Sequence, residues 1–204
     1  GSSSNQEKFI INMENGYDQL INLLNFIGVG HVHFHHTMDI PEEILHINKK
    51  LGCSYEITIH DYYLINANPT LTDKNAMFSG NSITERDELC KQHYPIPGGI
   101  SAVQWREKLS PWIENAERVI FPSSDTYVRF LMDYPKCVKN GIVAWHPDYE
   151  VNSPYPQVKP EYEKNRKLRV LVLGAISLEK GALMLDEVAN ELKNNKIEFH
   201  LLGY

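Results

Sequence analysis

The segment HVHFHH is the part of the chain richest in groups that could do chemistry, because it supplies His31, His33, His35 and His36. On a β-strand, alternate side chains share one face, so His31, His33 and His35 are expected to line one side of a sheet. Imidazoles gathered in this way suit a metal site or a polar surface for a ligand. The competing interpretation is structural, with one or two of the rings hydrogen-bonded beneath the following loop.

A second candidate is the pair His60–Asp61, which directly follows the strand-like run YEITI. A histidine at a strand tip can exchange a proton near neutral pH, and a neighbouring carboxylate can orient its ring. Ligands of open α/β sheets collect at the carboxyl ends of the strands, which is where this pair is predicted to lie. The alternative is a capped turn in which Asp61 accepts hydrogen bonds from backbone amides.

The third candidate is the loop GAISLEKG, residues 174–181. It matches neither the dinucleotide-binding pattern nor the P-loop pattern. It does offer Gly174 for close backbone approach, a helix N-terminus, and Lys180 as a cation, which together suit a phosphate or pyrophosphate. A solvated Lys180 beside a packing glycine, Gly181, is equally compatible with the sequence.

Alternating apolar runs and helical periodicities predict the elements that position these residues. The expected strands are Lys8–Asn12, His31–His35, Tyr55–His60, Arg118–Pro122, Gly141–Trp145, Leu168–Gly174 and Ile197–Tyr204. The expected helices span Tyr17–Ile27, Pro41–Leu51 and Ala102–Ala116, with one more capped by Ser123 or Ser124 and one more after the GAISLEKG loop. Residues 66–100 are expected to form a long irregular excursion.

This alternation predicts an α/β fold: a Rossmann-like domain with a parallel sheet, followed by the first βαβ unit of a second Rossmann-like domain. Residues 1–7 are interpreted as a tail left from cloning, because they open with GSSS. The first domain is expected over 8–145, a proline-containing linker over 146–167, and the start of the second domain over 168–204.

Composition narrows the choice of partners and compartment. The chain has 204 residues, of which 42% are hydrophobic, and a net charge of -6, which argues against a nucleic-acid partner. Its three cysteines form no CxxC pair, so neither a zinc knuckle nor a disulfide framework is indicated. No apolar run approaches the roughly 18 residues of a membrane span. We therefore expect a cytoplasmic protein, peripheral at most at the inner face of the membrane.

Taken together and in this order, HVHFHHTMDIP, ITIHDYY, ERVIFPSSD, the His146–Pro147 step and LRVLVLGAISLEKG resemble bacterial glycosyltransferases of the GT-B fold. The resemblance covers nearly the whole chain from Lys8 onward. It points to the large retaining family four group, and within it to the branch that builds surface polysaccharides. Such enzymes have two Rossmann-like domains facing across a cleft, the first holding the acceptor and the second the nucleotide-sugar donor.

The resemblance implies a role for each candidate residue. His60 would be catalytic, with Asp61 expected to act beside it as the carboxylate that orients its ring, and His35 and His36 would line the acceptor side. Ser123 and Ser124 would lie near the floor of the cleft and also bind substrate. Gly174 and Lys180 would contact the diphosphate of the donor. Transfer in this family generally needs no metal and no cofactor beyond the nucleotide-diphosphate sugar, and the acceptor would be a glycan or lipid-linked glycan.

Several features depart from the family pattern. Ala175 stands where many relatives have an arginine, which leaves Lys180 as the cation of the loop. Cys90 stands alone where some of the branch carries paired cysteines. The acidic motif that holds the donor sugar is expected beyond Tyr204, so the chain by itself is expected to be inactive and to self-associate through the open edge of its last unit.

Two other functions remain open at the level of sequence. One is a metal-dependent hydrolase that uses the His31–His36 cluster with His60 and Asp61. The other is a non-catalytic binding or assembly module that retains the fold without the chemistry.

Overall fold

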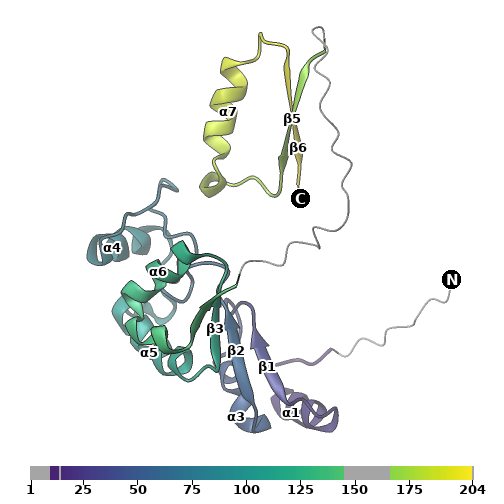
Figure 1. Cartoon of the computed structure of the whole chain (residues 1–204), viewed down its shortest axis with the longest axis vertical. Helices are drawn as coiled ribbons and strands as arrows, with labels where there is room; N and C mark the ends of the chain where they lie inside the picture. Colours follow the sequence, from purple (N-terminus) through teal and green to yellow (C-terminus); the bar gives the residue numbers. More distant parts are fainter. Residues whose placement is uncertain (1–9, 14, 145–165, 204) are drawn as a thin grey trace, which may run out of the picture. The chain divides into compact units, whose positions relative to one another are not determined.

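The computed structural model describes residues 10–13, 15–144 and 166–203. The described residues form two compact units (Figure 1). The first runs to Pro69 and resumes at Ile96, and the second contains Thr70–Pro95 and the segment after the linker. The expected tail and nearly all of the expected linker lie outside the described residues, so those two predictions stay untested.

The first unit is built on a parallel sheet with the strand order β1-β2-β3-β4. Its strands are β1 (His31–Phe34), β2 (Ser54–Thr58), β3 (Arg118–Phe121) and β4 (Gly141–Val143). Phe34 lies opposite Ile57, and Ile57 lies opposite Val119. The predicted α/β class with a parallel sheet is therefore confirmed, and the arrangement is compatible with a Rossmann-like fold.

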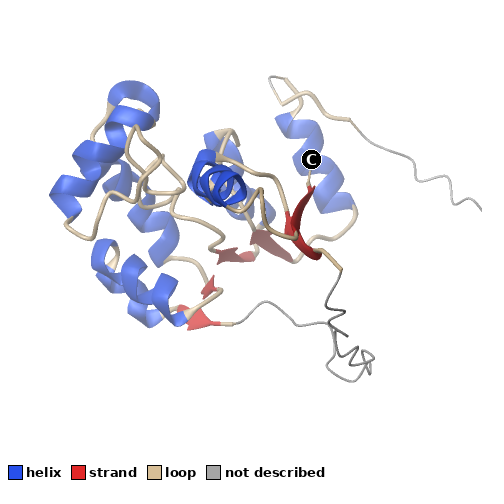
Figure 2. Cartoon of the chain, turned by 90° about the horizontal axis from the view of Figure 1, so that it is seen from above, coloured by secondary structure: helices blue, strands red, loops and turns tan. Residues whose placement is uncertain are grey.

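Helices connect the strands, and they cover one face of the sheet (Figure 2). The connections contain α2 (Glu42–Leu45), α3 (Ile47–Leu51), α5 (Ala102–Glu114) and α6 (Ser124–Asp133). Because parallel crossovers are almost always right-handed, a sequential strand order carries each of them to the same side. Trp112 of α5 packs edge-on against Phe34, with ring centroids 5.2 Å apart. Phe130 of α6 packs against Phe121, with ring centroids 5.1 Å apart. These contacts form the core of the unit.

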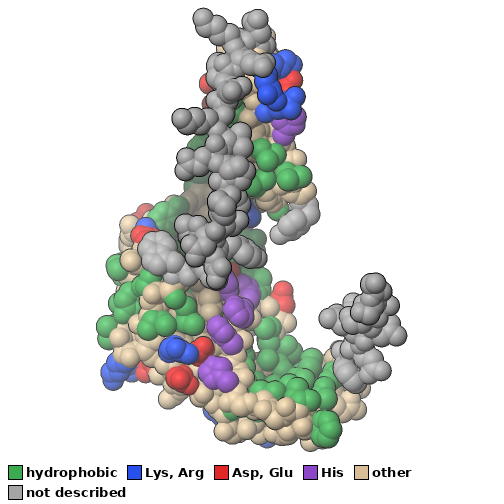
Figure 3. Space-filling model, turned by 45° about the vertical axis from the view of Figure 1, so that its right-hand side comes forward, with side chains coloured by type: hydrophobic (Ala, Val, Ile, Leu, Met, Phe, Trp, Pro, Cys, Tyr) green, Lys and Arg blue, Asp and Glu red, His purple; other side chains and the backbone are tan. Residues whose placement is uncertain are grey.

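The opposite face of the sheet is polar. Along β1, β2 and β3, side chains that point into the core alternate with side chains that point to this opposite face. The residues on this face include His31, His33, Glu56 and Arg118. Figure 3 shows histidine side chains side by side on one face of the molecule, next to basic and acidic side chains. Glu56 is buried and forms an ion pair with Arg118. None of the described helices covers this polar face of the sheet (Figure 2), although parallel sheets are usually covered on both faces.

Local signals explain most element ends. Gly52 ends α3 in the left-handed conformation, with φ of 64°. Ser101 and Gln104 form a reciprocal capping box at the start of α5. Helix α1 (Tyr17–Phe26) and the short helical turns η1 (Pro97–Gly99) and η2 (Pro135–Lys139) complete the first unit.

Three local expectations were wrong. The described part of the predicted strand Lys8–Asn12 is not a strand. The helix expected from Pro41 is divided at His46 into α2 and α3. The excursion is not wholly irregular, because α4 spans Ile83–His93. The sequence signal for α4 is a serine followed three residues later by a glutamate, but the helix has few apolar residues to reveal its period.

The segment after the linker forms a βαβ unit, as predicted. Its elements are β5 (Leu168–Leu173), η3 (Leu178–Lys180), α7 (Ala182–Glu191) and β6 (Ile197–Leu202), and the two strands pair in parallel. Leu171, Leu173 and Leu202 are 57%, 70% and 63% exposed. Because parallel strands normally bury both faces, this surface is consistent with self-association, which stays a prediction. No helix in the described segments is long and apolar enough to cross a membrane.

Candidate functional site

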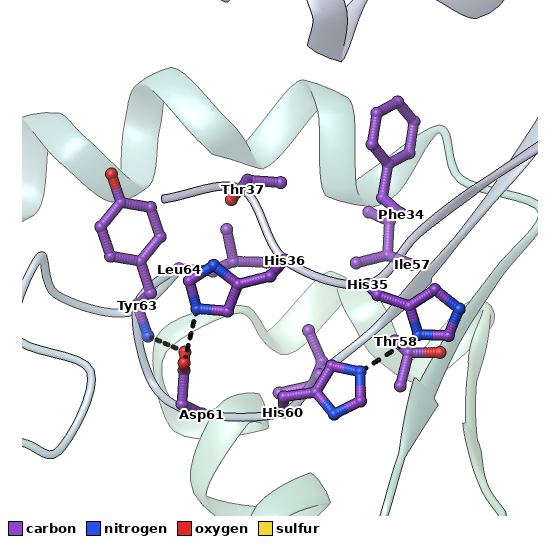
Figure 4. A pocket seen from close by; sticks show the side chains of 11 residues that line it. Phe34, His35, His36, Thr37, Ile57, Thr58, His60, Asp61, Tyr63 and Leu64 are labelled. Atoms are coloured by element: carbon purple, nitrogen blue, oxygen red, sulfur yellow. Dashed lines mark hydrogen bonds and ion pairs between the residues drawn. The ribbon is translucent and has the colours of Figure 1, made fainter. Parts of the chain in front are cut away.

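The parallel sheet brings His35, His36, His60 and Asp61 together at one edge (Figure 4). His35 and His36 follow β1, and His60 and Asp61 follow β2, which is the neighbouring parallel strand. The carboxyl ends of both strands therefore deliver their loops to the same place. The four residues line a small cavity of about 20 Å³, which has room for a single water molecule.

His36 and Asp61 form an oriented pair. The backbone N–H of Met38 donates to His36 Nδ1 at 3.1 Å, so Nδ1 must be unprotonated. His36 Nε2 therefore carries the proton of the neutral ring and donates it to Asp61 Oδ2 at 2.7 Å. The other carboxylate oxygen of Asp61 accepts from the backbone N–H of Tyr63 at 2.9 Å. The capped-turn interpretation of Asp61 is thus correct, and the same carboxylate also orients a histidine.

His35 and His60 form the second pair. His35 Nδ1 lies 3.2 Å from His60 Nε2, so one ring must donate and the other accept. The hydrogen bond requires an N–H on one ring and an unprotonated nitrogen on the other. His35 also stacks on His33, with ring centroids 4.3 Å apart.

The remaining histidines of the cluster lie along β1 on the polar face, as the alternation predicted. His31 Nδ1 lies 2.9 Å from Ser54 Oγ, and His33 Nε2 lies 2.7 Å from Thr58 Oγ1. The pKa of His33 is lowered below its ordinary value of 6.5, first by burial and then by the neighbouring charge of His35. The neutral form of His33 is therefore favoured in the folded protein.

We expect this preference to make stability depend on pH. The pKa of His33 is lower in the folded state than its unfolded value of about 6.5. The contribution of neutral His33 to folding stability is therefore fully present above pH 6.5 and is lost as the pH falls through the folded-state pKa. Chemical denaturation of wild type and His33→Gln should therefore show a stability difference that shrinks between about pH 7.5 and pH 5. Glutamine retains a hydrogen-bond donor for Thr58 Oγ1 and has no group that titrates in this range. A difference that stays constant with pH would contradict this prediction.

Ser123 and Ser124 lie at the same edge of the sheet, because they follow β3. Ser123 Oγ accepts from the backbone N–H of Thr126 at 3.1 Å and caps α6, while Ser124 is the first residue of that helix. Among the described residues, neither serine lines the small cavity between the histidines. Their predicted contact with substrate is untested, whereas the predicted cap is confirmed at Ser123.

Gly174 and Lys180 belong to the βαβ unit that follows the linker. Gly174 directly follows β5 and has a φ of 99°, which favours glycine. The amides of Lys180 and Ala182 donate to the carbonyl of Ser177, each at 3.1 Å, and so close a tight turn. A phosphate ligand would therefore be met chiefly by the exposed ammonium group of Lys180 rather than by these two amides.

Gly203 is a residue of this loop region that sequence analysis missed. A Cβ atom at Gly203 would lie 2.2 Å from the carbonyl oxygen of Gly174. Only glycine therefore lets the end of β6 approach the strand tip this closely. The signal in the sequence was a second glycine directly after a strand-like run.

The site also contains residues that sequence analysis did not select. Tyr63 stacks on His36, with ring centroids 5.8 Å apart, and Thr58 binds His33. Tyr63 and Thr58 belong to the site because they contact its histidines, and such contacts cannot be read from a single sequence. Within the described ranges, no group of three or more histidine, cysteine or acidic side chains is arranged to hold a metal ion.

Comparison with known proteins found no matching family model, no matching curated protein and no matching solved structure. What this chain can do is therefore inferred from its own geometry and from the resemblance of its motifs.

Proposed function

We propose that the chain is part of a GT-B glycosyltransferase that transfers a sugar from a nucleotide-diphosphate sugar to a glycan or lipid-linked glycan acceptor. The observation that carries the proposal is the convergence of His35, His36, His60 and Asp61 at the carboxyl edge of a parallel sheet. The same motifs, in the same order, produced the resemblance to surface-polysaccharide glycosyltransferases. The βαβ unit with Gly174 and Lys180 is the expected entry to the donor site.

The chemistry of the proposed reaction matches these groups. The bond between the anomeric carbon and the diphosphate breaks, a bond to the acceptor oxygen forms, and the acceptor hydroxyl loses its proton. Neutral imidazoles such as His60 and His35 can hold that hydroxyl and accept its proton. Lys180 would stabilise the negative charge that develops on the departing nucleoside diphosphate.

The hydrolase alternative is less well supported. Its chemistry needs several ligands that converge on one metal ion. In the described segments His35 instead pairs with His60 and His36 with Asp61, and no group of three or more metal-ligating side chains is formed. The remaining alternative is a binding or assembly module, which differs from the proposed transferase because it does not need a nucleotide.

Titration with nucleoside diphosphates tests the proposed function directly. UDP, GDP, ADP and dTDP would be added to the ¹⁵N-labelled chain, with the parent nucleosides as controls. We expect at least one diphosphate to shift the backbone signals of residues 174–181, and its nucleoside to bind more weakly. If no diphosphate shifts these signals at about 10 mM, where even a millimolar site is occupied, the donor-site proposal is wrong and the binding-module alternative gains.

A further inference from the structure

A second cavity, of about 300 Å³, opens beside the histidine site. Thr37 and Tyr63 line both this cavity and the small one between the histidines, so the two adjoin. Binding sites for small molecules begin at about 300 Å³. The larger cavity can therefore hold a group the size of one ring, directly next to the residues proposed to act on the substrate.

The apolar part of its lining is well packed. Trp105 and Leu109, both on α5, are 9% and 5% exposed. Trp105 meets the ring of Tyr63 edge-on at 5.4 Å, and its indole Nε1 donates to the backbone carbonyl of Tyr63 at 3.1 Å. Since Tyr63 also stacks on His36, the aromatic wall of the cavity is fixed to the histidine site.

The charged part of the lining consists of Asp39, Glu42 and Lys108. Lys108 Nζ lies 2.7 Å from Glu42 Oε2 and so links α5 to α2 across the cavity. Both side chains are about half exposed, and such pairs contribute little to stability. Their atoms therefore remain able to bind a ligand at small cost.

Asp39 and Tyr63 add an acceptor and a donor. Asp39 has a φ of 59°, a left-handed conformation that aspartate tolerates better than most residues. The pKa of Tyr63 is raised, first by burial and then by the carboxylates of Asp39 and Asp61. The Tyr63 hydroxyl consequently stays protonated and can donate a hydrogen bond.

We propose that this cavity binds one uncharged sugar ring of the acceptor, adjacent to the ring that meets the histidines, so that the acceptor is a disaccharide or longer. A sugar ring has apolar C–H faces and a hydroxyl edge that both donates and accepts, which suits an aromatic wall with mixed polar groups beside it. Lys108, the cation of this lining, is already paired with Glu42, which disfavours an anionic ligand. The inference rests on the proposed function for the identity of the acceptor, but its test uses acceptor binding alone.

The indole signals of the chain provide the test. Of its three tryptophans, Trp105 lines the cavity, whereas Trp112 lies in the core and serves as an internal control. Maltose, cellobiose, lactose, mannobiose and N,N′-diacetylchitobiose would each be added at about 50 mM, enough to occupy a millimolar site. We expect at least one to shift the Trp105 Nε1–H signal, assigned through Trp105→Phe, and to leave that of Trp112 unchanged.

Substitutions of the charged lining residues test the same cavity. Lys108→Met and Asp39→Asn should each weaken binding of the disaccharide that shifts the Trp105 signal about tenfold, as expected for the loss of a hydrogen bond to a charged group. Lys136→Met is the matched control, because Lys136 forms a comparable exposed pair with Glu114 away from the cavity. It should leave the affinity unchanged.

The outcomes separate the two proposals. The sugar-ring inference is overturned if no disaccharide moves Trp105, or if Trp105 responds only to a charged amine such as ethanolammonium. A sugar response without any nucleoside diphosphate binding would support the cavity and refute the donor site at residues 174–181. Nucleotide binding without a response at Trp105 would support the donor site and refute the sugar-binding cavity.

Discussion

Replacing Lys180 with methionine is expected to weaken binding of a nucleoside diphosphate about tenfold to a hundredfold. A hydrogen bond from a charged donor to an anion contributes about 1.5–3 kcal/mol, which corresponds to this range. The effect should be near the upper part of the range because the amides of Lys180 and Ala182 are already bonded to Ser177. Isothermal titration of the purified variant with the diphosphate identified for wild type measures the change.

Lys196→Met is the matched control for this experiment. Lys196 precedes β6 and therefore lies at the opposite edge of the two-stranded sheet from Lys180, which follows β5. It is also an exposed lysine of the same unit. Equal losses of affinity in both variants would show that general charge, rather than a phosphate site at Lys180, accounts for binding.

Replacing Asp61 with asparagine is expected to disrupt the orientation of His36 and to lower the free energy of unfolding by about 1–2 kcal/mol. Asparagine has one oxygen, which the backbone N–H of Tyr63 already uses. Its amide group would then face the Nε2–H of His36, donor against donor, while Nδ1 is held as an acceptor by Met38. The cost is limited because the side chains of His36 and Asp61 are 41% and 29% exposed.

Two measurements check this expectation together. Denaturation gives the loss of stability, and long-range ¹H–¹⁵N spectra of the imidazole give the tautomer of His36. Asp125→Asn is a suitable control, since Asp125 forms an exposed pair with Arg129 one turn further along α6 and should cost about 0.5 kcal/mol or less. The pairing inferred here is refuted if Asp61→Asn retains both the wild-type stability and the wild-type tautomer.

The strands and most helices of the first unit could be predicted from the sequence because their signals are local. The alternation of His31, Val32, His33 and Phe34 decides which side chains share a face, whatever surrounds the strand. Gly52 and Ser123 mark helix boundaries through their own backbone and side-chain chemistry. Where the local signal was weak, as in α4 of the second unit, the helix was not predicted.

The site itself could be predicted only in outline. The sequence indicated that the histidines and His60–Asp61 lie at strand ends, and parallel topology then requires such ends to share an edge. It did not indicate that His35 pairs with His60 and His36 with Asp61, because each pair joins residues 25 positions apart. That pairing depends on the register of β1 against β2, which places His31 opposite Ser54.

The residue pattern was enough to predict an α/β chain whose histidines line one face of a strand and whose last unit is a βαβ with a glycine and a lysine in its loop. Two features became visible only in the folded chain: Asp61 both caps its turn and orients a histidine, and α5 brings Trp105 beside Tyr63 to form the wall of a second cavity. Periodicity and capping act within a few residues, whereas ring pairs and cavities depend on strand register and helix packing between distant segments.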